Sequence, residues 1–123
     1  MAPLKILVVD DSVLAIRKLE AIFAILGHRV VKTANCGAAA LEAYKESNPD
    51  LVTMDITMPD MDGIEVTKTL TASFPDARII MITSHGQEGM VRKAIKAGAM
   101  GYLLKPVRAD RLKDLIDKIL RDS

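Results

Sequence analysis

The sequence has few of the residues that crosslink a small protein or anchor it in a membrane. It contains a single cysteine, so Cys36 cannot form a disulfide within the chain, which agrees with a reducing cytoplasm. The amino-terminal residues lack the cationic start and long apolar stretch of a signal peptide. No apolar run approaches the roughly 20 residues that span a bilayer. We therefore predict a cytoplasmic protein without a membrane segment.

The chain also lacks an excess of charge of either sign. Its 17 basic and 16 acidic residues leave a formal net charge of +1, so no global field attracts nucleic acid or an anionic membrane. Half of the residues are apolar, although only 3% are aromatic. A chain of 123 residues can bury roughly two-thirds of its unfolded surface. We expect one domain over residues 1–123, with no linker or repeat.

Short apolar runs alternate with segments of helical spacing along the chain. Strands are predicted at 6–9, 28–34, 51–54, 79–82 and 102–104, and helices at 13–26, 37–47, 62–74, 87–97 and 109–120. The run at 28–34 is polar enough for a sheet edge. The first helix is predicted to turn one stripe inward, formed by Val13, Ile16, Leu19, Ile22, Phe23 and Leu26. The alternation predicts an α/β fold, a parallel sheet covered on both faces.

Polar residues follow four of the predicted strands at the point where each strand ends. Asp10 and Asp11 follow the first strand, Asp55 the third, Thr83 the fourth and Lys105 the fifth. The carboxyl ends of parallel strands lie at one edge of a sheet, where such folds bind ligands. Taken singly, the aspartates could cap a helix or form a turn, and Lys105 could be a solvated surface lysine. Together they predict one site.

The predicted site combines several carboxylates. Carboxylates within about 5 Å repel by roughly 3 kcal/mol per pair at an effective dielectric near 20. A hard divalent cation removes this repulsion, and a set of oxygen ligands favours Mg²⁺, with Mn²⁺ or Ca²⁺ as substitutes. Lys105 and the Thr83 hydroxyl suit an incoming phosphoryl group. Asp55 is then either a metal ligand only or a nucleophile that accepts phosphate as a mixed anhydride.

Four motifs in this order resemble the two-component response-regulator receiver domain, and most resemble its stand-alone chemotaxis regulators of the CheY type. They are Val8-Val9-Asp10-Asp11-Ser12, Met54-Asp55-Ile56-Thr57-Met58-Pro59-Asp60-Met61-Asp62-Gly63, Ile82-Thr83-Ser84 and Ala97-Gly98-Ala99-Met100-Gly101-Tyr102-Leu103-Leu104-Lys105-Pro106. The resemblance covers the whole chain. It implies a doubly wound, flavodoxin-like (βα)5 fold with strand order 2-1-3-4-5, and a receiver domain without an output domain.

The resemblance also implies roles for single residues. Asp55 would be the phosphoacceptor, and Mg²⁺ would bind Asp10, Asp11, Asp55 and the backbone carbonyl of Thr57. Lys105 would bind the phosphoryl group, and the Lys105–Pro106 bond would be cis. Thr83 and Tyr102 would be switch residues, and Thr57 and His85 would tune dephosphorylation.

The implied function is a phosphorylation-dependent signalling switch of the chemotaxis type. A sensor histidine kinase or phosphotransfer protein would be the donor, and a downstream target would bind residues 87–120. By primary role such a protein is not an enzyme, although it can catalyse its own phosphorylation from phosphodonors and its own dephosphorylation. We expect a monomer that binds neither nucleic acid nor membranes.

Two alternatives remain open at this point. The chain could be the receiver excised from a multidomain transcriptional regulator. It could instead be a small enzyme, either a flavodoxin-like FMN carrier or an aspartyl phosphatase. Asp10 and Asp11 would repel a flavin phosphate. Thr57 stands two residues after Asp55, where a phosphatase needs a second carboxylate.

Overall fold

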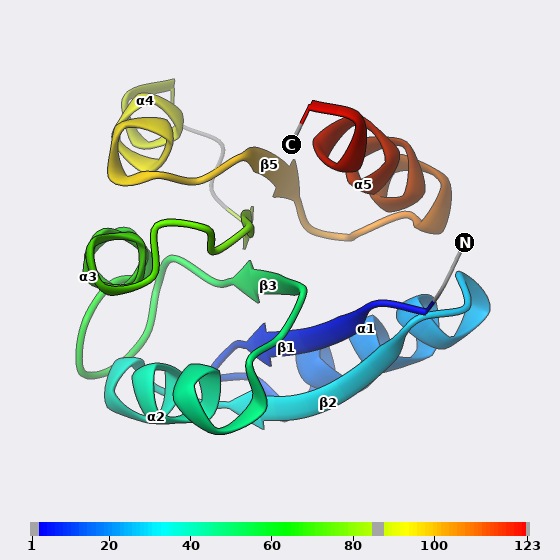
Figure 1. Ribbon diagram of the computed structural model, residues 1–123, viewed down its shortest axis with the longest axis horizontal. Coiled ribbons are helices and arrows are strands. Elements are labelled where there is room, and N and C mark those ends of the chain that lie inside the picture. Colours follow the sequence, from blue (N-terminus) through cyan, green and yellow to red (C-terminus); the bar gives the residue numbers. More distant parts are fainter. Residues whose placement is uncertain (1–2, 85–87, 123) are drawn as a thin grey trace.

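Five strands alternate with five helices along the chain (Figure 1). The computed structural model describes residues 3–84 and 88–122. The elements are β1 (Lys5–Val9), α1 (Val13–Ile25), β2 (Arg29–Ala34), α2 (Gly37–Ser47), β3 (Leu51–Met54), α3 (Gly63–Ser73), β4 (Ile79–Thr83), α4 (Glu88–Ala97), β5 (Gly101–Leu104) and α5 (Ala109–Asp122). Each corresponds to an element predicted from the sequence. Gln87, the predicted start of the fourth helix, lies outside the described residues.

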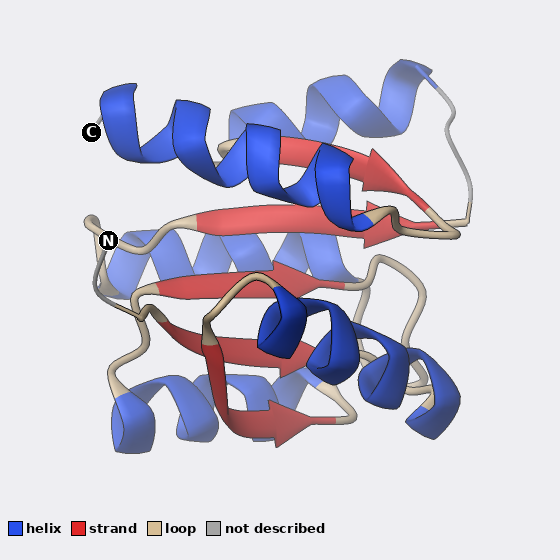
Figure 2. Ribbon diagram, turned by 90° about the vertical axis from the view of Figure 1, so that its right-hand side faces the viewer, coloured by secondary structure: helices blue, strands red, loops and turns tan. Residues whose placement is uncertain are grey.

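The strands form one parallel sheet in the order β2-β1-β3-β4-β5. All arrowheads therefore point to the same edge (Figure 2). The predicted doubly wound α/β fold and its strand order are confirmed. The chain steps outward from β1 to β2 and then back across β1 to β3, so a crevice opens between the carboxyl ends of β1 and β3. β2 lies at the predicted edge.

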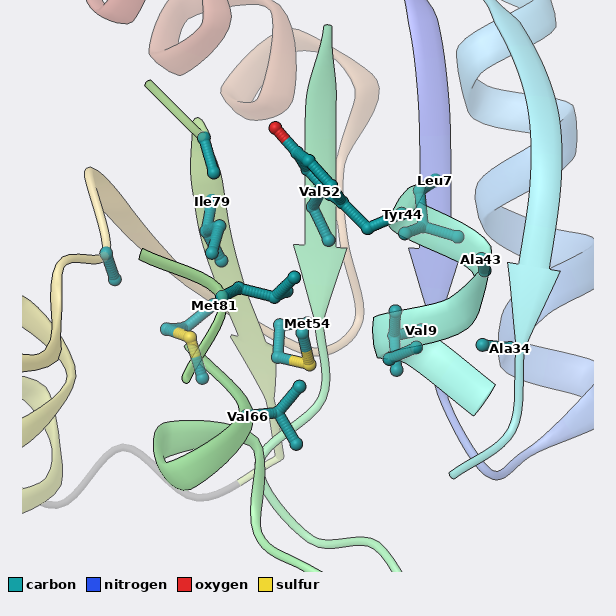
Figure 3. Close-up of a cluster of buried hydrophobic side chains, with 14 of the residues drawn as sticks. Leu7, Val9, Ala34, Ala43, Tyr44, Val52, Met54, Val66, Ile79 and Met81 are labelled. Atoms are coloured by element: carbon teal, nitrogen blue, oxygen red, sulfur yellow. The ribbon is translucent and has the colours of Figure 1, made fainter. Parts of the chain in front are cut away.

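Helices cover both faces of the sheet. α1 and α5 pack on one face, and α2, α3 and α4 pack on the other (Figure 1). Alternate residues of β1, β3 and β4 supply both cores, as expected for strands buried on both faces. Figure 3 shows the larger core, to which the strands contribute Val9, Met54 and Met81, α2 contributes Tyr44 and α3 contributes Val66.

One residue of the predicted inward stripe of α1 faces solvent. Leu19 and Phe23 are buried, but the Val13 side chain is 65% exposed. The helix begins at Val13, whereas β1 has already ended at Val9. The first turn of α1 therefore lies near the carboxyl edge of the sheet, where little of the sheet remains to cover it. The inward orientation predicted for Val13 is wrong, because helical spacing does not show where the underlying sheet ends.

The two ends of the described chain lie at the edge away from the arrowheads (Figure 2). β1 starts there at Lys5, and α5, which runs opposite to the strands, finishes there at Asp122. Asp122 lines a small pocket of ≈ 270 Å³ together with Met100, which directly precedes β5. None of the described helices combines the length and apolar character needed to cross a membrane.

Candidate functional site

Three carboxylates from two strand ends meet at the carboxyl edge of the sheet. Asp10 and Asp11 follow β1, Asp55 follows β3, and one oxygen from each lies within 4.8 Å of the others. We call these three residues the acidic cluster. Asp10 and Asp55 are buried, whereas Asp11 is exposed. The sequence predicted this meeting from the parallel sheet alone.

Backbone hydrogen bonds fix the base of the cluster. The Asp10 N–H donates to the Ala34 carbonyl of β2 at 3.0 Å, and the Asp55 N–H donates to the Val9 carbonyl of β1 at 2.9 Å. Each bond extends the sheet ladder one residue beyond the strand. The Asp10 carboxylate also accepts from the Ser12 N–H at 2.9 Å. The buried aspartates are therefore held by the sheet itself.

Lys105 bridges the two buried carboxylates. Its Nζ lies 2.8 Å from Asp10 Oδ2 and 3.6 Å from Asp55 Oδ1. Burial lowers the pKa of the Lys105 ammonium, but the hydrogen bond to Asp10 and the charges of Asp55 and Asp10 outweigh burial, so the pKa is raised. Lys105 is thus a fixed positive charge beside the acidic cluster.

Asp55 is the member of the acidic cluster whose negative charge is disfavoured. Burial, followed by the negative charge of Asp10, raises the pKa of Asp55 to about 6, although Lys105 acts in the opposite direction. The protein thus disfavours the charged form of this carboxylate. A divalent cation among the three oxygens would favour that form, and all three ligands are the hard oxygens that Mg²⁺ prefers. The residues fit the predicted magnesium site.

The other predicted site residues lie on β4, on β5 and in the loop after β3. Thr83 is buried at the end of β4, where its carbonyl accepts from the Lys105 N–H at 2.8 Å. Tyr102 is half-buried on β5, and Thr57 is exposed two residues after Asp55. The Lys105–Pro106 bond is cis, as predicted. His85 lies outside the described residues.

Gly63 makes a close contact that its place as a turn residue did not reveal. Its N–H donates to the Ile56 carbonyl at 2.7 Å. A Cβ on Gly63 would lie 1.9 Å from the Asp55 carbonyl oxygen, a distance at which the backbone must move. The start of α3 therefore presses directly against the residue that carries the buried carboxylate. The sequence gives the glycine, but the partner is visible only in the fold.

Residues 6–117 match the response regulator receiver domain. The chain belongs to this family. It is 47% identical over 116 residues to the chemotaxis protein CheY of Bacillus subtilis (strain 168), which covers 94% of this chain and 97% of that protein. It is also similar to the transcriptional regulatory protein LnrK of the same organism, at 36% identity, but spans only 50% of LnrK.

Solved structures agree with this assignment. A crystal structure of a CheX–CheY complex with BeF3 and Mg²⁺ from Borrelia burgdorferi matches with a TM-score of 0.91 at 35% identity, covering 96% of this chain and 90% of that one. The chain is thus a CheY-like receiver domain of two-component signalling, a class of signalling proteins and not of classical enzymes.

Proposed function

We propose that this receiver is a phosphorylation-dependent switch in which Asp55 accepts a phosphoryl group from a histidine of a sensor kinase or phosphotransfer protein. The observation that carries the proposal is the acidic cluster with Lys105 between its two buried carboxylates. In the transfer, the phosphorus–nitrogen bond of the donor breaks and a bond forms between phosphorus and an Asp55 carboxylate oxygen. The product is a mixed anhydride.

Mg²⁺ would be held by the three carboxylates and the Thr57 carbonyl, where it would neutralise charge on the phosphoryl oxygens. The chain's own groups do the rest. The sheet fixes the position of Asp55, and Lys105, 3.6 Å from its Oδ1, supplies a positive charge for an oxygen of the arriving group. Phosphorylation also replaces a carboxylate by a group with more charge and more acceptor oxygens.

A groove beside the acidic cluster offers a contact surface for the donor. It has a volume of ≈ 560 Å³ and is mostly apolar, and its lining includes Leu14 and Ile22 of α1 and Pro106. Ser12 and Lys105 belong both to this groove and to the surroundings of the cluster. A donor protein seated there would bring its phosphohistidine next to Asp55. Val13 and Leu14 are 65% and 64% exposed beside the groove, which suits such a contact.

The response would pass to the surface formed by α4, β5 and α5. The Lys105 N–H donates a hydrogen bond to the Thr83 carbonyl. Movement of Lys105 or Thr83 toward a phosphoryl oxygen would therefore displace the ends of both β4 and β5. Tyr102 and the 52% exposed Leu104 lie on β5, where a pocket of ≈ 420 Å³ is lined also by Val91 and Arg111. We propose that a downstream target, of the chemotaxis type, binds here and reads this change. That this receiver is monomeric and has no output domain stays a prediction.

The phosphoacceptor can be tested by incubating the parent and Asp55→Asn with Mg²⁺ and acetyl phosphate, followed by intact mass measurement. We expect one phosphoryl adduct on the parent and none on Asp55→Asn. Asp76→Asn is the matched control, because Asp76 is an exposed aspartate in the turn before β4, and it should react like the parent. An adduct of undiminished yield on Asp55→Asn would overturn the assignment.

A further inference from the structure

The Asp60 side chain ties the loop after β3 to the start of α2. Its Oδ1 accepts from the Gly37 N–H at 2.8 Å, and its Oδ2 accepts from the Ala38 N–H at 3.1 Å. Oδ1 also accepts from the Met61 N–H at 2.9 Å. The carboxylate thus joins two segments that lie more than 20 residues apart in the sequence.

Helix α2 has no cap of its own at this end. The residue at its N-cap is Cys36, whose side chain makes no capping hydrogen bond, and its first turn contains no acidic residue. The first N–H groups of a helix have no partners within the helix and carry partial positive charge. Asp60 supplies both an acceptor and a negative charge from outside the helix. Accordingly, the hydrogen bonds from Gly37 and Ala38 lower the pKa of Asp60.

Apolar contact reinforces the same junction. Gly37 is buried against the loop, and a Cβ there would lie 2.7 Å from Met61 Cγ and 3.0 Å from Val66 Cγ2. The loop after β3 therefore rests on the first residue of α2 through both polar and apolar contacts. Its position is set by α2 as well as by the strand that precedes it.

This loop begins at Asp55 and carries Thr57. Ile56 and Met58, on either side of Thr57, are buried, and the Gly63 N–H holds the end of the loop at the Ile56 carbonyl. Asp60 lies between these two anchor points and supplies the hydrogen bonds that fix the outer part of the loop to a neighbouring helix, beside the apolar contact of Met61. The direction of the Thr57 carbonyl depends on how the whole loop is placed.

We propose that Asp60 is a positioning residue for the metal site: by capping α2 it fixes the outer part of the loop whose Thr57 carbonyl would complete the Mg²⁺ ligands. The inference rests on the proposed function, because it needs Mg²⁺ to bind there. Removing the carboxylate takes away the hydrogen bonds of the outer loop to α2 and loosens it, so that Mg²⁺ binding must order it again. Outer partners of metal ligands commonly change affinity by 10- to 100-fold, and for this exposed contact we expect the lower end, on the order of tenfold.

The test is isothermal titration of Mg²⁺ into the parent, Asp60→Ala and Asp60→Asn. We expect the dissociation constant to rise on the order of tenfold in Asp60→Ala and by less in Asp60→Asn, which keeps one acceptor oxygen. Asp76→Ala, which removes a charge elsewhere, and Ile116→Val, which loosens the core under α5, should bind Mg²⁺ like the parent. These controls separate positioning from loss of charge and from loss of stability.

Amide NMR signals of Gly37 and Ala38 provide a second readout in the folded protein. In the parent, saturation with Mg²⁺ should shift both signals, because loop and helix respond together, and in Asp60→Ala this response should be lost. An unchanged Mg²⁺ affinity in Asp60→Ala, or no response of these amides in the parent, would overturn the inference. Asp60 would then cap α2 without affecting the metal site. If the parent itself fails to bind Mg²⁺, the proposed function fails and not this step alone.

Discussion

Thr53 has a buried hydroxyl among apolar side chains, two residues before Asp55. It lies at the centre of β3, beside Val8 of β1 and Ile80 of β4, and is 1% exposed. Within the described part of the chain, its Oγ1 has no hydrogen-bond partner. A buried hydroxyl without a partner costs free energy, whereas an apolar group of the same shape does not.

We therefore expect Thr53→Val to raise the free energy of unfolding by about 1 kcal/mol. Urea unfolding measures this gain. The matched control is Thr67→Val, because the equally buried Thr67 hydroxyl donates to the Gly63 carbonyl at 2.8 Å and should be costly to remove. A loss of stability in Thr53→Val as large as in Thr67→Val would contradict the prediction.

The raised pKa of Asp55 makes stability depend on pH. Its folded-state value of about 6 lies above the ordinary 3.8, so the folded protein binds this proton more tightly than the unfolded chain. The resulting stabilisation is fully present below pH 3.8 and is lost as pH rises through about 6. Without Mg²⁺, Asp55→Asn should be more stable than the parent at pH 8, by about 1–2 kcal/mol after solvent screening is allowed for.

Urea unfolding of both proteins in a chelator, at pH 8 and at pH 5, checks this. The advantage of Asp55→Asn should shrink at pH 5, where much of the parent's Asp55 is protonated. An advantage of equal size at both pH values would show that the charge on Asp55 is not its cause.

At the scale of elements, the junction between β3 and α3 leaves no space for a side chain. A Cβ on Gly63 would meet the Asp55 carbonyl oxygen at 1.9 Å, whereas one on Gly89, inside α4, would have nothing within 4 Å. Gly63→Ala must therefore push α3 away from Asp55. We expect it to cost about 3 kcal/mol of stability, at the upper end for overpacking, and to weaken Mg²⁺ binding.

Gly89→Ala provides the matched control for Gly63→Ala. Alanine is the better helix former by up to about 1 kcal/mol, so this change should stabilise the protein slightly and leave Mg²⁺ affinity unchanged. Thermal unfolding and Mg²⁺ titration of both variants give the comparison. If Gly63→Ala were as stable as the parent, the close approach of Gly63 to Asp55 would not limit which side chain fits there, and the prediction would be wrong.

For the whole molecule, the acidic cluster predicts that folding and Mg²⁺ binding are coupled. The cluster is assembled only when β1 and β3 are paired, so Mg²⁺ binds the folded state in preference to the unfolded chain. At 100 times its dissociation constant, such a ligand stabilises by about 2.7 kcal/mol. The melting temperature of the parent should rise with Mg²⁺ concentration. The rise should be largely lost in Asp10→Asn and kept in Asp76→Asn, and a parent indifferent to Mg²⁺ would exclude the metal site.

The buried strands and the residues of the acidic cluster can be predicted from local sequence, because runs of a few residues specify them. The apolar runs at β1, β3 and β4 define the buried strands, and the polar residues that end them become neighbours through the geometry of any parallel sheet. Asp10, Asp55 and Lys105 could therefore be brought together before the structure was known. Their roles came from the family resemblance and remain proposals.

Other features depend on contacts between segments far apart in the chain. The capping of α2 by Asp60 spans 22 and 23 residues, and nothing near Asp60 indicates its partners. The missing cap at Cys36 is a signal that some acceptor must come from elsewhere, but not which one. Val13 was misplaced for a similar reason, since its exposure depends on where β1 ends.

The position of the two chain ends has a practical consequence. β1 starts and α5 finishes at the sheet edge opposite the acidic cluster (Figure 2). A fluorescent fusion partner or a tether to a sensor chip, attached at either end, would point away from Asp55. Protein immobilised in this way would present the edge that carries the acidic cluster to solution, so donor and target binding could be measured on an oriented layer without blocking the reacting side.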